Sequence, residues 1–292
     1  MKPYEWMLKF TPQTEWIEGK GIFLWLAFYV GGLGGGLYLV ALYFDNFLGM
    51  LISWFIVLVL KGGFHLIYLG HPIRFWRMFF RPQTSWISRG LYFVTLFIAL
   101  VPLQFLLAYF APGTKLEVMV KLAALVMAVG MSIYTGLVMN YMVAIQLWNS
   151  ALLPVLFLLC GLAGGFGLML GIGHFQGGVD IVAIETGSII LITAIAALIA
   201  IYLTSARYVG SAGKQSVAEL LRGRVACVFW LGVVLCGIVI PSAISLNSLL
   251  GGNTSDAMLL TAIICEIVGG LTLRYALLKS GFYQPLLPIT LY

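Results

Sequence analysis

The chain has 292 residues, of which 62% are hydrophobic and only 9% are charged, with a formal net charge of +6. Soluble globular domains are typically about 45–50% apolar and about 25% charged, so too few polar side chains are present here to cover a water-facing surface. The composition excludes a soluble protein and predicts an integral membrane protein. The positive charge then indicates loops that face anionic membrane lipid or a partner protein, and nucleic acid is not an expected partner.

Eight apolar segments are long enough to cross a bilayer, which takes about 20 helical residues. In chain order they cover residues 21–44, 47–70, 90–111, 116–141, 149–173, 181–205, 223–247 and 257–280. The expected fold is an all-α integral membrane protein with eight transmembrane helices in one domain, residues 1–292. Most connections are short, but residues 71–89 and 206–222 form longer, basic loops.

An even number of crossings places both ends of the chain on one side of the membrane, together with both basic loops. Most of the 16 lysine and arginine residues fall on that side. The positive-inside rule makes it the cytoplasmic side, although a basic surface that docks a partner protein explains the same distribution.

Two helices carry glycine-rich segments. The first contains GGLGGG at residues 31–36, and the fifth contains GLAGGFG at residues 161–167. Small residues allow membrane helices to approach closely. The similarity is compatible with a duplicated unit, and therefore with two four-helix bundles, and also with two independent close crossings.

Few ionisable side chains lie at membrane depth, where they are costly and mark pathways or binding sites. Lys61 and His65 share a face of the second helix, because they are four residues apart. We expect Lys61 to pair with Glu266 of the eighth helix, since an unpaired buried charge is unfavourable. The predicted proton pathway consists of Lys61, Glu266, Arg274 and Glu185; a purely structural ion pair is the alternative.

The three histidines argue against haem b, which needs two axial ligands at similar depth. His65 and His174 are expected at opposite ends of the bundle, and His71 precedes Pro72 in a loop. No cluster of residues has metal-ligand spacing, and the four cysteines form no CxxC pair. We therefore expect neither haem nor metal in this chain.

The loop after the second helix is the most distinctive segment, YLGHPIRFWRMFFRPQTSWISRG at residues 68–90. It resembles the corresponding segment of the NrfD/PsrC family, the quinone-reactive membrane subunits of polysulfide-reductase-type complexes. The family pattern is Leu-Gly-x-Pro-x-Arg-x-Trp, then a proline, then Ser-Trp-x-Ser-x-Gly. The YTG segment at residues 134–136 and GGLTLRY at residues 269–275 are similar to the family as well.

The resemblance implies a membrane subunit of a respiratory oxidoreductase in the cytoplasmic (inner) membrane of a prokaryote. Such a subunit binds menaquinone or ubiquinone and exchanges electrons with a four-cluster iron–sulfur subunit, which serves a catalytic subunit that often contains molybdopterin. The terminal reaction then uses no catalytic residue of this chain. A redox-linked proton pump, an ion or solute transporter, and a purely structural membrane anchor are the alternative functions.

We also expect particular roles for individual residues, of which that of Tyr134 is carried over from the family. Tyr134, in the YTG segment, is expected at one quinone oxygen, and His65 or Glu18 at the other. Trp86 suits an interface that is apolar at one end and wet at the other. Four loop arginines are expected to dock the partner and to hold the loop over the quinone head; they are Arg74, Arg77, Arg81 and Arg89.

Overall fold

The computed structural model describes residues 7–11, 13–252 and 255–284, and within these ranges eight helical segments are long and apolar enough to cross a membrane. The prediction of an all-α membrane protein is confirmed. The largest difference in a boundary is at the seventh span, which was predicted from residue 223 and begins at Val228. The eight spans are Gly21–Tyr43, Phe47–Tyr68, Trp86–Phe110, Lys115–Asn140, Leu152–Gln176, Ile181–Val209, Val228–Leu249 and Asp256–Lys279.

Six of the spans are single α-helices: α2 (Gly21–Tyr43), α5 (Trp86–Phe110), α6 (Lys115–Asn140), α7 (Leu152–Gln176), α8 (Ile181–Val209) and α11 (Asp256–Lys279). The second span joins α3 (Phe47–Phe55), the π-helix η2 (Ile56–Lys61) and α4 (Gly62–Tyr68). The seventh joins the π-helix η4 (Val228–Val239) and α10 (Ile240–Leu249). Five of these helices begin after a side chain that accepts a hydrogen bond from a first-turn N–H, as N-caps do; the caps are Asn46, Ser85, Thr114, Asp180 and Ser255.

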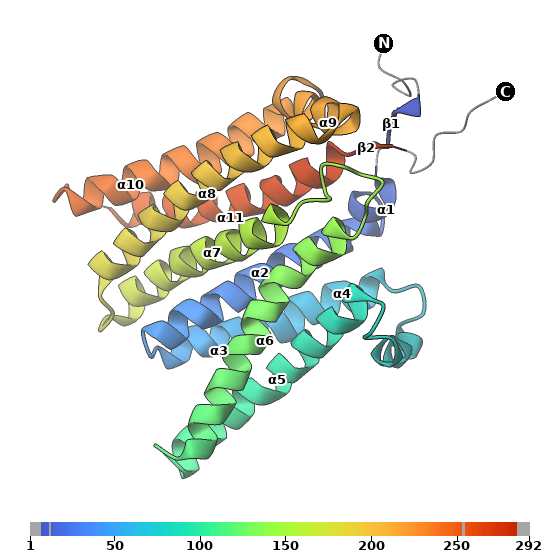
Figure 1. Ribbon diagram of the computed structural model, residues 1–292. Helices are drawn as coiled ribbons and strands as arrows, with labels where there is room; N and C mark the ends of the chain where they lie inside the picture. The colour runs from blue at the N-terminus through green and yellow to red at the C-terminus, as the bar shows by residue number, and fades with distance from the viewer. Residues whose placement is uncertain (1–6, 12, 253–254, 285–292) are drawn as a thin grey trace.

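The remaining elements gather at one end of the helix bundle, on the right in Figure 1. They are β1 (Lys9–Phe10), α1 (Thr14–Ile17), the 3-10 helix η3 (Pro72–Phe80), α9 (Ser211–Arg222) and β2 (Phe282–Tyr283). Strands β1 and β2 pair in antiparallel register. Because this end also carries both basic loops, we call it the basic end. The predicted placement of both termini concerns residues 1–6 and 285–292, which lie outside the described residues, and the cytoplasmic assignment stays a prediction.

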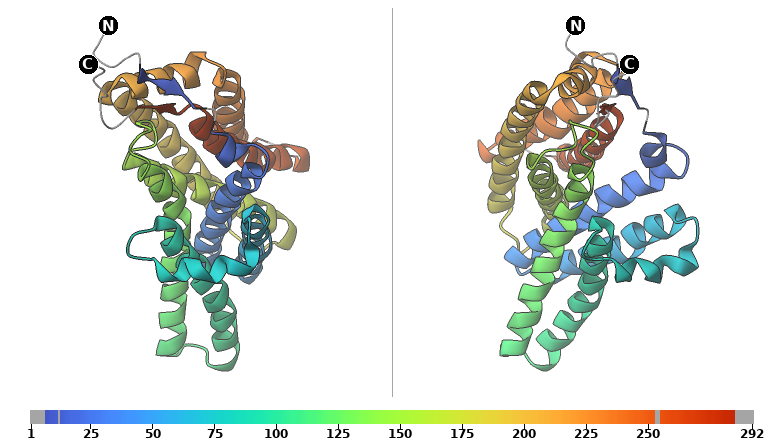
Figure 2. Two further views of the ribbon diagram at one scale, coloured as in Figure 1. Left: turned by 90° about the vertical axis from the view of Figure 1, so that its right-hand side faces the viewer. Right: turned by 45° about the vertical axis from the view of Figure 1, so that its right-hand side comes forward.

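The spans form two groups of four, with α2 and α7 in contact between them (Figures 1 and 2). The first group holds α2, the α3–α4 span, α5 and α6, and the second holds α7, α8, the η4–α10 span and α11. Two large clusters of buried apolar side chains fill the bundle: one lies mainly in the second group, and the other reaches from the first group into α7, α8 and α11. This division agrees with the predicted pair of four-helix bundles.

The two glycine-rich segments meet each other. A carbon atom added at Gly161 would lie 2.6 Å from the carbonyl oxygen of Gly32, and one added at Gly165 would lie 2.5 Å from the carbonyl carbon of Gly36. Only glycine therefore allows α2 and α7 to cross backbone against backbone. The alternative of two independent crossings is wrong, because the two glycine-rich segments cross each other.

Candidate functional site

The first polar cluster centres on Lys61, which is 1% exposed although residues 58–60 before it face outward. The wide π-helical turn of η2 ends at Lys61 and directs it into the bundle, as such turns often do at functional sites. Its Nζ donates to the hydroxyl of Tyr134 at 2.9 Å and to the carbonyl oxygen of Ala27 at 3.2 Å. The buried ammonium group thus has two oxygen partners.

Tyr134 is held in place from three sides. A carbon atom added at Gly90 of α5 would overlap the Tyr134 ring, so this glycine admits the ring. Phe28 of α2 meets it edge to face, with ring centroids 6.4 Å apart, and Lys61 Nζ lies 4.8 Å from its ring centre. The Tyr134 hydroxyl accepts a hydrogen bond from Lys61, and no described residue accepts the hydroxyl's own proton.

His65 follows Lys61 by one helical turn and completes the cluster. Its Nδ1 lies 3.2 Å from the carbonyl oxygen of Lys61. Because a carbonyl only accepts hydrogen bonds, Nδ1 carries the proton and Nε2 of the neutral ring is an acceptor. Phe28 contacts the His65 ring as well, at a centroid distance of 6.4 Å. We call Phe28, Lys61, His65, Gly90 and Tyr134 the Lys61–Tyr134 cluster.

Glu18 and Trp86, the other two predicted quinone contacts, differ in their distance from the cluster: one lies outside it and the other packs close to it. Glu18 is half-exposed and forms an ion pair with Lys279 at the basic end, so the structure does not bring it into the cluster. Trp86 begins α5 one turn before Gly90 and packs against the apolar core that contains Tyr134. Sequence reasoning missed Trp16 of α1, whose ring packs on Phe28 at 6.1 Å. Its only signal was an aromatic residue shortly before the first span.

Three of the four loop arginines are exposed, namely Arg74, Arg77 and Arg81. In a 3-10 helix, residues three apart share a face, which places Arg74 and Arg77 of η3 together. The guanidinium of Arg77 lies 5.6 Å from the ring centre of Trp76. The outer surface of η3 is therefore both basic and aromatic.

Arg89 differs from the other three arginines because its guanidinium binds the loop itself. Nε donates to the carbonyl oxygen of Pro82 at 2.7 Å, and Nη2 donates to that of Gln83 at 2.8 Å. The same group lies 4.3 Å from the ring centre of Trp86. These contacts hold the loop at residues 82 and 83, whereas Arg74, Arg77 and Arg81 stay exposed.

The predicted pair of Lys61 with Glu266 is wrong, because Lys61 donates to Tyr134 and Ala27 instead. Lys61 lies against Gly31 and Arg274 against the next residue, Gly32, which faces another direction. Glu266 instead accepts a hydrogen bond from Ser188 Oγ of α8 at 2.7 Å. The four residues of the predicted proton pathway are therefore not in one place.

Arg274 and Glu185 are the other two residues of the predicted proton pathway. The guanidinium of Arg274 lies 5.3 Å from the ring centre of Tyr29 and 4.7 Å from that of Phe157, and Nη1 donates to the carbonyl oxygen of Gly270 at 3.0 Å. Glu185 is 5% exposed near the start of α8, one turn before Ser188.

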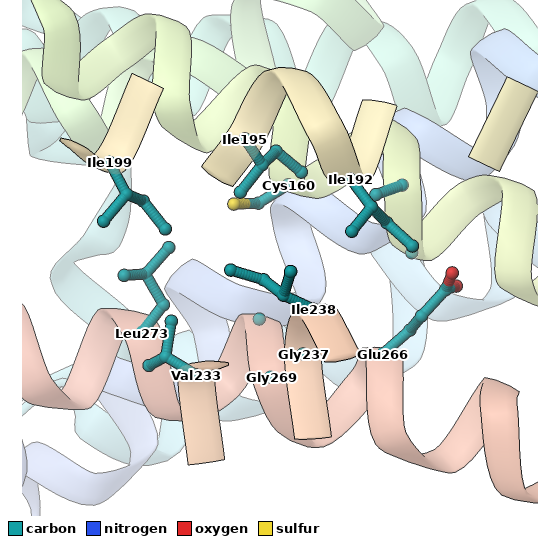
Figure 3. A pocket seen from close by; sticks show the side chains of 13 residues that line it. Cys160, Ile192, Ile195, Ile199, Val233, Gly237, Ile238, Glu266, Gly269 and Leu273 are labelled. Carbon is teal, nitrogen blue, oxygen red and sulfur yellow. The ribbon is translucent and has the colours of Figure 1, made fainter. Parts of the chain in front are cut away.

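Two hollows lie away from the Lys61–Tyr134 cluster. A cavity of about 30 Å³ lies between α7, α8, η4 and α11 and borders Glu266 (Figure 3). An apolar groove of about 490 Å³ is lined by residues of α3, α7 and α11, among them Leu48, Ile172 and Phe175. Within the described ranges, no group of three or more His, Cys, Asp or Glu side chains could hold a metal ion.

Comparison with known proteins identifies relatives. The family described as "Polysulphide reductase, NrfD" matches residues 21–285. A polysulfide reductase chain of Wolinella succinogenes is 27% identical over 167 residues, which cover 55% of this chain and 53% of that protein. The NrfD homolog of Haemophilus influenzae is 24% identical over 196 residues, covering 61% and 57%. A tetrathionate reductase subunit of Salmonella typhimurium is 26% identical over 179 residues, covering 60% and 52%. The chain spans about half the length of these relatives.

Proposed function

This chain belongs to the polysulphide reductase NrfD family, and on that premise we propose that it binds a quinol at the Lys61–Tyr134 cluster and passes the electrons to a partner subunit. Two of the named relatives are subunits of polysulfide and tetrathionate reductases. A membrane subunit of an oxidoreductase complex accounts for both the eight spans and these names.

One observation carries the proposal. Lys61 donates to the oxygen of Tyr134, which leaves the tyrosine hydroxyl proton for an acceptor from outside the described residues. His65 offers the opposite group, an Nε2 that accepts, because its Nδ1 is bound to a backbone carbonyl. A quinol presents one oxygen to each group: one accepts from Tyr134, and the other donates to His65. These two complementary groups support the proposal that the cluster binds the two oxygens of a quinol head.

Quinol oxidation releases two electrons and two protons. Nε2 of His65 takes the proton of the hydroxyl that it binds, and the second proton leaves to water at the basic end. The electrons pass to the iron–sulfur clusters of the partner subunit, which deliver them to a catalytic subunit of molybdopterin type.

The surface of α4 supports access from the lipid. Nothing lies within 4 Å of a carbon atom added at Gly63, so this part of the α4 surface is open. Leu66 and Ile67 are 48% and 52% exposed and face outward. The apolar tail of menaquinone or ubiquinone would lie against this exposed surface, within the bilayer.

The partner would bind at η3, next to this entrance. Arg74, Arg77 and Arg81 offer charge, and Trp76 offers apolar area, a combination that favours an acidic protein surface with an apolar centre. Docking there would place the partner's iron–sulfur clusters close to the quinol and shorten the electron-transfer distance.

The test compares two buried tyrosines in the intact complex. Tyr134→Phe removes the hydroxyl that Lys61 holds, and a lost hydrogen bond to a charged group is worth about 1.5–3 kcal/mol. We expect kcat/KM for quinol oxidation to fall at least about tenfold. Tyr38→Phe is the control, because Tyr38 is fully buried and donates a hydrogen bond to Gln104 outside the cluster. Equal turnover of the two variants would contradict the proposal.

A further inference from the structure

Two ionisable side chains of α11 are buried with incomplete hydrogen bonding. Glu266 is 9% exposed and Arg274 is 1% exposed. Oε2 of Glu266 and both Nε and Nη2 of Arg274 have no hydrogen-bond partner among the described residues. Buried polar atoms in native proteins nearly always have partners, and ordered water is the usual one when protein atoms are absent.

The spacing on α11 relates these two side chains. Glu266, Gly270 and Arg274 are four residues apart in succession and share one face of the helix. With a rise of about 1.5 Å per residue, the two ionisable residues are separated by about 12 Å along the axis. Gly270, between them, has no side chain to fill this distance. Its carbonyl oxygen accepts from Arg274, and a carbon atom added there would lie 3.0 Å from the Tyr29 ring.

The cavity lies beside this face. Glu266 and Gly270 both line it, and Figure 3 shows the Glu266 carboxylate at one end, beyond the apolar side chains of Ile192 and Ile238. Its volume of about 30 Å³ exceeds the roughly 10–15 Å³ that one water molecule requires. Space for about two water molecules therefore lies next to a carboxylate that needs a partner.

We propose that this cavity is hydrated and that Glu266 is a proton-exchange site in the second group of helices, with Arg274 balancing its charge. The carboxyl group of Glu266 gives its proton to a cavity water and takes one back, so no electron transfer and no further reactant are needed. Ser188 positions the carboxyl group through its hydrogen bond to Oε1. Tyr29 and Phe157 hold the guanidinium between their rings. The proposal does not rest on quinol binding.

Infrared spectroscopy of the purified complex, without quinol, tests this proposal. Spectra are recorded in H₂O and in D₂O from acidic to alkaline pH. We expect a carboxyl band that is absent from Glu266→Gln, that changes intensity reversibly with bulk pH, and that shifts within minutes of transfer to D₂O. Glu185→Gln is the matched control, since Glu185 is a second buried carboxyl group on a facing helix, and it should leave this band in place.

Two outcomes would overturn the proposal: a Glu266 band that keeps its frequency in D₂O for hours, and a Glu266 that stays ionised over the whole pH range. Ser188→Ala makes the assignment secure, because loss of its hydrogen bond should move the Glu266 band without removing it. A failure of quinol turnover would not affect any of these readouts, so the two proposals can fail separately.

Discussion

Each of the two polar regions of the bundle places a cationic side chain against a glycine of α2, and the two glycines are adjacent in the sequence. The two cations differ in their hydrogen-bond partners. Lys61, against Gly31, donates to Tyr134 and to a backbone carbonyl. Arg274, against Gly32, lies between two aromatic rings and makes one backbone hydrogen bond, with two nitrogen atoms left over. A cation with its own partners can orient a neighbouring hydroxyl for a ligand. We propose that water partners the second region, and water can carry protons.

The largest effect is expected where both regions depend on one contact, the crossing of α2 and α7. Gly36→Val would force a side chain into the backbone of Gly161, and packed membrane helices have no way to absorb that overlap. We expect loss of the folded protein, measured as the monodisperse fraction in size-exclusion chromatography. Gly63→Ala is the control, because the space around Gly63 is open. Similar yields from both variants would contradict the close crossing.

The difference between the two regions is tested by Lys61→Met. This change keeps most of the length of the side chain and removes the donor that holds Tyr134. We expect kcat/KM for quinol oxidation to fall about 10- to 100-fold, in line with a lost charged hydrogen bond of about 1.5–3 kcal/mol. The Glu266 infrared band should stay unchanged, since neither hydrogen bond of Lys61 involves Glu266 or Ser188. A shifted Glu266 band would show that the two regions are coupled.

A smaller effect is expected at the loop that adjoins only the first region. Arg89→Gln removes the hydrogen bonds to Pro82 and Gln83. Because the loop would then cover the cluster less firmly, quinol oxidation should slow by about threefold to tenfold. Arg81→Gln is the matched control: it should weaken binding of the partner subunit in a salt-dependent way and leave quinol affinity unchanged. The opposite result, in which Arg81→Gln slows quinol oxidation and Arg89→Gln weakens partner binding, would contradict these two roles.

The smallest effect belongs to the second region. Ser188→Ala removes one hydrogen bond from Glu266, worth about 1 kcal/mol. Quinol oxidation should stay within about twofold of the wild type, while the Glu266 band moves. A large loss of quinol turnover in this variant would mean that the second region takes part in quinol chemistry.

Sequence reasoning was most successful where hydropathy and composition decide the structure. The eight spans follow from apolar runs, and the close approach of helices follows from the glycines at residues 31–36 and 161–167. That these two segments meet each other could not be derived, since glycine content says nothing about which helix is the partner. Tyr134 was placed by the resemblance of its YTG segment, and the structure surrounds it with Lys61, Phe28 and Gly90.

The errors have a physical origin as well. Lys61 was paired with Glu266 because both were buried charges, but a π-helical turn and the position of α2 give Lys61 other neighbours. A prediction from regular α-helical spacing does not anticipate a π-helical turn. The assignment of Glu18 to the quinone stays a prediction, and the structure pairs this side chain with Lys279, which is distant in the sequence.

Quinol binding at the Lys61–Tyr134 cluster is tested most directly by mapping where a quinone head binds. A photoreactive quinone analogue would be bound to the purified complex, irradiated, and mapped by mass spectrometry, with an excess of native quinone as the competitor. We expect competed labelling in residues 62–68 of α4 and 86–93 of α5, and loss of this labelling in Tyr134→Phe. Competed labelling instead at the cavity of Ile192 and Ile195, or in the groove of Leu48 and Phe175, would contradict quinol binding at this cluster.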